Sequence, residues 1–218
     1  MKYEQILALL SLDRAADEKA RDVLDGLVPE FDEGFLSKLI KDRKVAVFGC
    51  GPSLKDDFEN MRDGFGECVL VSVDGSVRLF REEGVIPQVH VTDLDGDVPA
   101  TIWANENGAV TIVHAHGDNI DKVRDVVPKL SGTVYGTTQV EPTSKIRDFG
   151  GFTDGDRAVY LAEHFNPSEI ILAGMDFGDE IGEYSGTYEP EKKAKKLKIG
   201  RILLEELMAE TLTPIKKA

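Results

Sequence analysis

The chain has 218 residues, of which 41% are hydrophobic and 30% charged, a balance typical of a folded globular protein. Its 40 acidic residues outnumber 26 basic ones, and the net charge of -14 excludes nucleic-acid binding through bulk positive charge. Two cysteines are too few for a disulfide framework, and no apolar run approaches the roughly 18 residues of a membrane span. We therefore expect a cytoplasmic protein with neither a nucleic-acid nor a membrane partner.

The first part of the chain shows apolar residues at helical spacing in three short stretches, within residues 6–10, 16–27 and 31–40. Few side chains in this part suit chemistry. We expect residues 1–43 to form a helical N-terminal segment used for packing or for a homodimer contact. A second, larger unit is expected over residues 44–218, ending in a helix.

From residue 44 onward, short β-branched runs alternate with helical patterns. Continuous apolar runs are typical of strands buried on both faces of a parallel sheet. The expected strands lie at residues 45–48, 69–73, 89–91, 109–113, 133–135 and 170–173. Helices are expected around residues 55–64, 76–84, 98–107, 118–128, 154–165 and 190–209. This alternation predicts an α/β fold, a Rossmann-like, doubly wound, mainly parallel sheet, in which ligands bind at the C-terminal strand ends.

The first two strand ends carry residues suited to a nucleotide. The first is followed by two glycines, a proline and a serine: Gly49, Gly51, Pro52 and Ser53. The glycines allow close backbone approach to a phosphate, and Ser53 can cap the next helix or donate to a phosphate oxygen. Leu54 stands where a dinucleotide fingerprint needs its third glycine. After the second strand, Asp74 and Gly75 suit a ribose hydroxyl, or Asp74 forms a local turn.

The third strand end carries three alternating aspartates, Asp93, Asp95 and Asp97. They repel one another unless a cation lies among them, and hard carboxylate oxygens favour Mg²⁺. We expect a metal site here, with Asp97 further away and able to cap the following helix. The alternative is an exposed acidic turn.

Later strand ends add histidines and further charges. His114 and His116 share one face of an extended segment and are expected to face phosphate or substrate. Asp118 is expected close to the metal, or as a helix cap. Asp154 stands at the start of a helix that it can cap, and Arg157 can reach a phosphate or pair with a nearby carboxylate.

The final helix begins with six cations: Lys192, Lys193, Lys195, Lys196, Lys198 and Arg201. Such a run is usually a solvated helix face. In an acidic chain it is also suited to close over bound phosphates.

Taken together, these motifs resemble one family. The resemblance rests on residues 48–54, 73–75, 91–96, 114–119 and 151–158 and extends over nearly the whole chain. The family is that of the archaeal 6-hydroxymethyl-7,8-dihydropterin diphosphokinases (MptE-like proteins), and thiamine diphosphokinase is more distantly similar. The resemblance implies Mg²⁺-dependent transfer of diphosphate from ATP to the pterin hydroxymethyl group, with release of AMP, in tetrahydromethanopterin or folate-type biosynthesis.

Motifs and resemblance together give the expected site of this catalytic domain. The expected metal ligands are Asp93, Asp95 and Asp118. The expected catalytic residues are Asp93, Asp95, His116, Asp118 and Arg157. ATP is expected to contact Gly49, Gly51, Pro52, Ser53, Asp74, Gly75, Asn119 and Asp154.

Two other classes stay open. The loop after the first strand also resembles that of bacterial sialyltransferase-like and flagellin-modifying proteins, which suggests a glycosyltransferase that uses a nucleotide sugar. A non-catalytic nucleotide-binding module would bind ATP and leave every acceptor unchanged.

Overall fold

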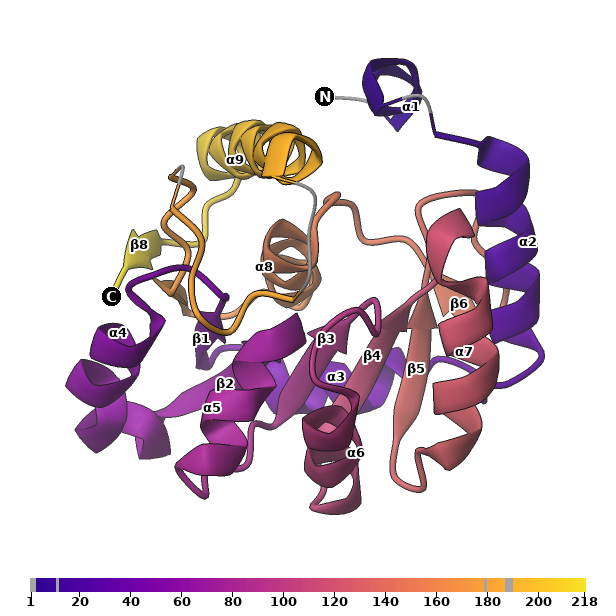
Figure 1. Ribbon diagram of the computed structural model, residues 1–218. Helices are drawn as coiled ribbons and strands as arrows, with labels where there is room; N and C mark the ends of the chain where they lie inside the picture. Colours follow the sequence, from indigo (N-terminus) through magenta and orange to yellow (C-terminus); the bar gives the residue numbers. More distant parts are fainter. Residues whose placement is uncertain (1–2, 11, 179, 187–189) are drawn as a thin grey trace.

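The computed structural model describes residues 3–10, 12–178, 180–186 and 190–218, and for residues 190–192 the backbone alone. An eight-stranded sheet forms the centre, with strand order β6-β5-β4-β3-β2-β1-β7-β8 (Figure 1). Every pair of neighbouring strands is parallel. The prediction of an α/β fold with a mainly parallel sheet is therefore confirmed.

The strands begin and end close to the predicted runs. They are β1 (Lys44–Phe48), β2 (Cys68–Val73), β3 (Val89–Thr92), β4 (Val110–His114), β5 (Val134–Thr137), β6 (Ile146–Arg147), β7 (Glu169–Ala173) and β8 (Ile215–Lys217). Two edge strands, β6 and β8, were not expected from the sequence. Central strands are buried along most of their length, as the unbroken apolar runs predicted.

Helices cover both faces of the sheet. They are α1 (Tyr3–Leu10), α2 (Arg14–Asp25), α3 (Glu33–Ile40), α4 (Leu54–Met61), α5 (Val77–Glu82), α6 (Val98–Glu106), α7 (Ile120–Val126), α8 (Asp154–His164) and α9 (Pro190–Glu210). Figure 1 shows α4, α5, α6 and α7 along one face, α3 and α8 on the other, and α9 stacked outside α8. None of the helices within the described residues is long and apolar enough to cross a lipid bilayer.

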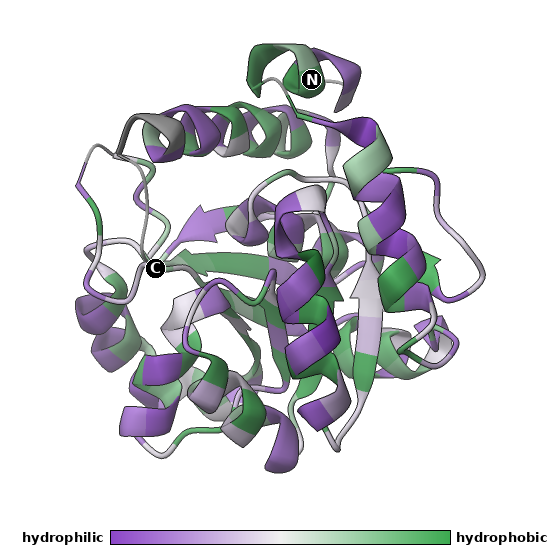
Figure 2. Ribbon diagram, turned by 45° about the vertical axis from the view of Figure 1, so that its right-hand side comes forward, coloured by the Kyte–Doolittle hydropathy of each residue, from purple (hydrophilic) through white to green (hydrophobic). Residues whose placement is uncertain are grey.

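The packing follows from the strand pattern. Successive side chains of a strand point to opposite faces, so Val45 and Val47 of β1 join the core under α3 and α8, while Ala46 and Phe48 face α4 and α5. On that second face Phe48 meets Phe58 at a ring-centroid distance of 5.6 Å. In Figure 2 the central strands are mostly coloured hydrophobic, whereas hydrophilic and hydrophobic residues alternate along the surrounding helices.

The strand order has a reversal that positions the site. From β1 the chain adds β2 to β6 on one side, and then returns to place β7 and β8 on the other side. At this reversal the loops that leave β1 and β7 pack against each other, and the N–H groups of Gly49 and Gly51 donate to Ala173 O and Gly174 O. In doubly wound sheets such a switch point is where ligands bind.

Candidate active site

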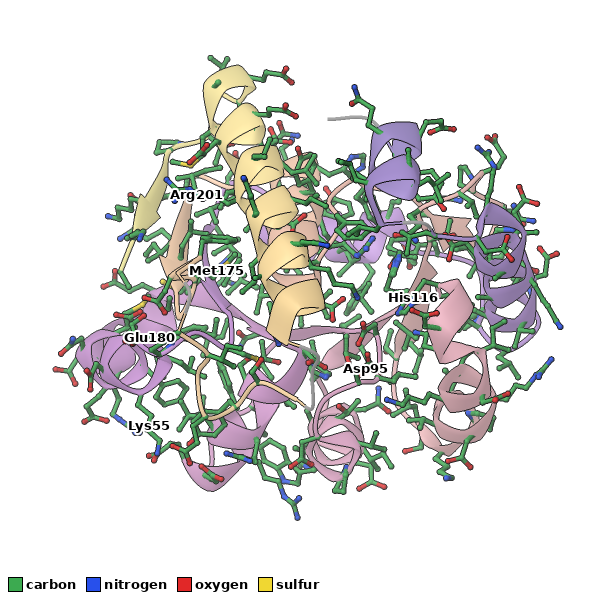
Figure 3. All side chains as sticks on the ribbon, turned by 45° about the horizontal axis from the view of Figure 1, so that its top comes forward. Lys55, Asp95, His116, Met175, Glu180 and Arg201 are labelled. Atoms are coloured by element: carbon green, nitrogen blue, oxygen red, sulfur yellow. The ribbon has the colours of Figure 1, made fainter. Side chains whose placement is uncertain are left out.

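A cleft of about 810 Å³ opens at the C-terminal ends of the strands. Its walls come from the loops after β1, β2, β3, β4 and β7, from the start of α8, and from α2 and α9. Figure 3 looks down on this edge, with His116 and Asp95 on one side of α9 and Met175 and Glu180 on the other. Most of the predicted site residues line the cleft: Gly49, Gly51, Pro52, Asp74, Asp93, Asp95, His116, Asp118, Asp154 and Arg157.

The centre of the cleft is a group of three carboxylates. One oxygen from each of Asp74, Asp93 and Asp154 lies within 4.8 Å of the others. Asp74 follows β2 with a φ of 44°, a left-handed conformation that is uncommon for residues other than glycine. The backbone N–H of Asp93 donates to Oδ2 of Asp154 at 3.2 Å. This oxygen-only set fits a hard divalent cation such as Mg²⁺, which would be held by these three residues.

The electrostatics of this trio also favour a cation. Burial, followed by the charge of Asp93, raises the pKa of Asp74 to about 7. Burial and the same neighbour raise the pKa of Asp154 well above its ordinary value. Burial is the largest single influence on Asp93 and opposes its ionisation, but the contacts with His116, the N–H of Asp95 and the charge of Lys196 together outweigh it and lower the pKa of that carboxyl. Three carboxylates so close ionise together only when a positive charge offsets their repulsion.

His116 is oriented by two contacts. Its Nδ1 accepts the backbone N–H of Asp118 at 3.3 Å, so the ring proton belongs on Nε2. Nε2 lies 3.3 Å from Oδ2 of Asp93 and donates to it. In this tautomer His116 orients a carboxylate and has no ring lone pair available to accept a proton from a substrate.

Asp95 and Asp118 lie outside the trio, which differs from the expected metal set of Asp93, Asp95 and Asp118. The expectation assumed an extended chain, but Leu94 takes a φ of 68° and buries its side chain. The turn sends Asp95 outward, where its Oδ1 lies 2.5 Å from Nζ of Lys122. Asp118 is exposed at the rim. Asp97 caps α6 as expected, because its Oδ1 accepts the N–H of Ala100 at 2.8 Å.

The glycines after β1 are required by packing against the loop after β7. The N–H of Gly49 donates to Ala173 O at 2.8 Å, and that of Gly51 donates to Gly174 O at 2.7 Å. A Cβ on Gly51 would lie 2.2 Å from Oδ2 of Asp176. The amides expected to meet a phosphate are thus bonded within the protein, and phosphate binding by this loop stays a prediction.

Asp176 covers the end of the same loop. Its Oδ2 accepts the backbone N–H of Ser53 at 3.1 Å and lies 3.1 Å from the Ser53 hydroxyl oxygen. That hydroxyl is also 2.6 Å from Oδ2 of Asp57, and it makes no capping bond to α4. A carboxylate therefore occupies the position in which the loop would present donors to a phosphate.

Three of the predicted ATP contacts do not line the cleft: Ser53, Gly75 and Asn119. Asn119 is buried and uses its whole amide inside the protein. Its Nδ2 donates to the carbonyls of Asp93 and His114 at 2.8 and 2.7 Å, and its Oδ1 accepts the N–H of His116. It ties the loops after β3 and β4 together. Gly75 is needed because a Cβ there would lie 1.9 Å from Tyr184 O.

The start of α8 carries Arg157 into the cleft wall. Thr153 occupies the N-cap position, and Oδ1 of Asp156 accepts the Thr153 N–H at 2.9 Å in a capping box. Arg157 is almost fully buried and donates from Nη2 to Phe152 O at 2.6 Å. No carboxylate partner of Arg157 is seen among the described residues.

The cation-rich part of α9 presents two lysines to the cleft. Lys193 and Lys196 line it, and Lys193 donates from Nζ to Ser185 Oγ. The side chain of Lys192 is outside the described residues, whereas Lys195 and Lys198 are exposed. Whether this segment closes over phosphates remains a prediction.

The lining residues that the sequence analysis missed include two that share a hydrogen bond. Asp17 of α2 and Gln139, in the loop after β5, line the cleft. Asp17 is buried and shares a helix face with Ala20 and Leu24, at positions i, i+3 and i+7. The sequence signal that could have identified Asp17 was a charged residue within an apolar helix face.

Comparisons of the sequence with known proteins show similarity over most of the chain. A family model described as 6-hydroxymethylpterin diphosphokinase MptE-like matches residues 21–182. A 6-hydroxymethyl-7,8-dihydropterin pyrophosphokinase of Methanothermobacter thermautotrophicus is 39% identical over 202 residues, covering 88% of this chain and 87% of its own. The protein of the same name from Methanocaldococcus jannaschii is 35% identical over 223 residues, covering 94% and 92%.

Among solved structures, a Maf glycosyltransferase from Magnetospirillum magneticum aligns with a TM-score of 0.54 at 16% identity. The alignment covers 96% of this chain and 39% of the other, and at this identity the likeness bears on the fold alone. Thiamine pyrophosphokinase from Bacillus subtilis aligns with a TM-score of 0.43 at 16% identity, covering 81% of this chain and 60% of its own.

Proposed function

The chain belongs to the 6-hydroxymethylpterin diphosphokinase MptE-like family, and we propose that it transfers diphosphate from ATP to 6-hydroxymethyl-7,8-dihydropterin. The relatives carry that activity in their names. The products would be AMP and the pterin diphosphate, in the biosynthesis of tetrahydromethanopterin or folate-type pterins.

The observation that carries this proposal is the carboxylate trio formed at the ends of β2 and β3 and the start of α8, with two lysines on the same cleft. Mg²⁺ would be held by Asp74, Asp93 and Asp154, where it would supply positive charge that offsets the charge of the phosphates. Lys196 lies close enough to Asp93 to lower its pKa, so positive charge already reaches the trio. An acidic protein thus concentrates cationic side chains where a triphosphate would lie.

The chain's own residues position the reactants. The substrate hydroxyl oxygen forms a bond to the β-phosphorus while the bond from that phosphorus to the α-phosphate oxygen breaks, AMP leaves with that electron pair, and the hydroxyl proton is released to water. His116 donates to Asp93 and fixes its carboxylate. Lys193 and Lys196 offset the charge that builds on the phosphates. Positioning and charge stabilisation supply most of the rate enhancement in phosphoryl transfer.

Phosphorus NMR of the full chain with ATP, Mg²⁺ and the reduced pterin alcohol tests the proposal. We expect AMP and a pterin diphosphate in equal amounts. Formation of ADP would contradict diphosphate transfer. An unchanged pterin alcohol would favour the alternative of a non-catalytic nucleotide-binding module. Chelation of the metal with EDTA is expected to stop turnover, and added Mg²⁺ to restore it.

A matched pair of variants tests the trio. Asp93→Asn is expected to lose at least about 100-fold in turnover, an effect of the size seen when one transition-state contact is removed. Asp97→Asn is the control, because Asn also caps helices well and Asp97 faces α6. Equal activity in both variants, with unchanged melting, would remove Asp93 from the site.

A further inference from the structure

One end of the cleft is built by the N-terminal helices and has no part in the chemistry described above. Asp17 of α2 lies there, buried, as an acceptor of three hydrogen bonds. Its Oδ1 accepts the N–H of Gly117 at 2.7 Å, and its Oδ2 accepts Nε2 of Gln139 at 2.8 Å and the hydroxyl of Tyr3. Gly117 admits the helix, since a Cβ there would lie 2.6 Å from that of Ala16.

Two buried polar atoms on the cleft wall lack hydrogen-bond partners among the described residues. They are Nε2 of His114 and Nε of Arg157. His114 is 1% exposed, and its other ring nitrogen lies 3.2 Å from the Thr137 hydroxyl. The Gln139 side chain lies beside the ring without completing a hydrogen bond of good geometry. Buried polar atoms normally have partners, so these two are exceptions in the wall at this end of the cleft.

The remaining surface of this end is apolar. Leu10, Leu12, Ala16 and Phe152 line it beside the polar groups. Aliphatic and aromatic side chains beside a few fixed hydrogen-bonding groups are typical of pockets that bind small organic molecules.

This end of the cleft is also linked to the carboxylate trio through two adjacent residues. Gly117, which contacts Asp17, directly follows His116, which contacts Asp93. Asp17 and the trio line the same cleft, so a bicyclic ring whose polar edge meets Asp17 and whose long axis follows the cleft would point its far end toward the carboxylates. In a 6-hydroxymethylpterin, the hydroxymethyl group and the 2-amino-4-oxo edge lie at opposite ends of the ring.

We propose that this end of the cleft binds the pterin ring, and that Asp17 selects the substrate by accepting the N–H donors of its 2-amino-pyrimidinone edge. The proposal rests on the proposed function. Two parallel N–H groups match the two oxygens of a carboxylate, as they do in an arginine–carboxylate pair. Tyr3 of α1 holds one of those acceptor sites, and a substrate N–H replaces its hydroxyl.

The test compares the pterin alcohol with its analogue that carries an oxo group in place of the 2-amino group. In the wild type the analogue's oxygen would face the Asp17 carboxylate, so we expect strong preference for the pterin. In Asp17→Asn the amide can donate to that oxygen. We expect the Michaelis constant for the pterin to rise about tenfold or more, the preference to fall by a similar factor, and the Michaelis constant for ATP to stay within about twofold.

Tyr3→Phe is the matched control, because it removes a hydrogen bond to Asp17 and keeps the carboxylate. We expect it to retain the preference and to bind the pterin at least as tightly. If Asp17→Asn does not fold, Gln139→Met removes the neighbouring polar group at similar volume and is expected to raise the pterin Michaelis constant about threefold.

The outcomes separate the two proposals. Unchanged pterin affinity and preference in a folded Asp17→Asn protein would show that Asp17 only packs α2 against the cleft, and would overturn this inference. Absence of turnover in the wild type with either compound would refute the proposed function instead. In that case, fluorescence titration of the pterin alcohol without ATP tests the proposed ring site separately. Equal affinity of the wild type and Asp17→Asn for the pterin alcohol would overturn the proposal that Asp17 binds the ring.

Discussion

Replacing Asp74 by Asn is expected to stabilise the metal-free protein at high pH. Burial and the charge of Asp93 raise the pKa of Asp74 from 3.8 to about 7. As pH rises from 3.8 toward 7, the unfolded chain releases this proton while the folded chain retains it. Rising pH therefore favours unfolding, and the effect is complete above about pH 7. Asn carries no proton to lose and removes this dependence.

The size of the effect follows from the pKa. The whole shift corresponds to at most about 4 kcal/mol at 1.36 kcal/mol per unit. Asp74 is partly exposed to the cleft, so water screens part of this. We expect the wild type to lose about 1.5 kcal/mol more than Asp74→Asn between pH 5 and pH 8. At this chain length that corresponds to about 3–6 °C in melting temperature.

Urea unfolding of EDTA-treated protein, followed by the fluorescence of the single tryptophan, measures this difference. Asp97→Asn is the control and is expected to keep the wild-type pH dependence. Added Mg²⁺ is expected to stabilise the wild type at pH 8, by about 2.7 kcal/mol at 100 times its dissociation constant, and to have little effect on Asp74→Asn. Parallel pH profiles of the wild type and Asp74→Asn would refute the reasoning about the trio.

Two further predictions concern the phosphate end of the cleft. Changing Lys193 and Lys196 together to Gln is expected to raise the Michaelis constant for ATP about fivefold without changing the melting temperature. The same change at the exposed pair Lys195 and Lys198 is expected to alter neither quantity. Steady-state kinetics in which the two double variants behaved alike would refute this prediction. Asp176→Asn is expected to tighten ATP binding, measured by calorimetry, about threefold, because it removes a negative charge beside the N–H donors of the loop after β1. Weaker binding would show instead that the Asp176 carboxylate contacts the nucleotide favourably.

The fold could be predicted from the sequence where apolar runs were long. Strands such as β1 and β2 are buried on both faces, and the unbroken apolar runs in their sequences indicate this burial. β6 has two residues and β8 has three, of which two are lysines. Segments so short carry no periodic signal, and they become strands only because a neighbouring strand offers unpaired backbone groups.

The site was predictable to the level of strand ends but not of individual contacts. The rule that ligands bind at C-terminal strand ends selected Asp74 and Asp93, and both line one cleft together with Asp154 from the start of α8. The left-handed turn at Leu94, which sends Asp95 to Lys122, depends on the buried position of that leucine. No local pattern announces such a turn in a residue other than glycine.

The contribution of α2 was missed for a different reason. Asp17 lies about 100 residues from Gly117 and about 122 from Gln139 in the chain. Only the packing of α2 against the loops after β4 and β5 brings them together, and a single sequence contains no record of that contact.

The edges of this open sheet are poorly suited to pairing with another chain. At one end β6 offers only Ile146 and Arg147, and the guanidinium of Arg147 is held by Glu33 at 2.8 Å. At the other end β8 presents Lys216 and Lys217, and lysines on an edge strand oppose the approach of a second strand. Short, charged edges protect an all-parallel sheet from aggregation during and after folding. For the same reason, a dimer that continued the sheet from one chain into the next is disfavoured, and self-association of this protein would have to use its helical surfaces.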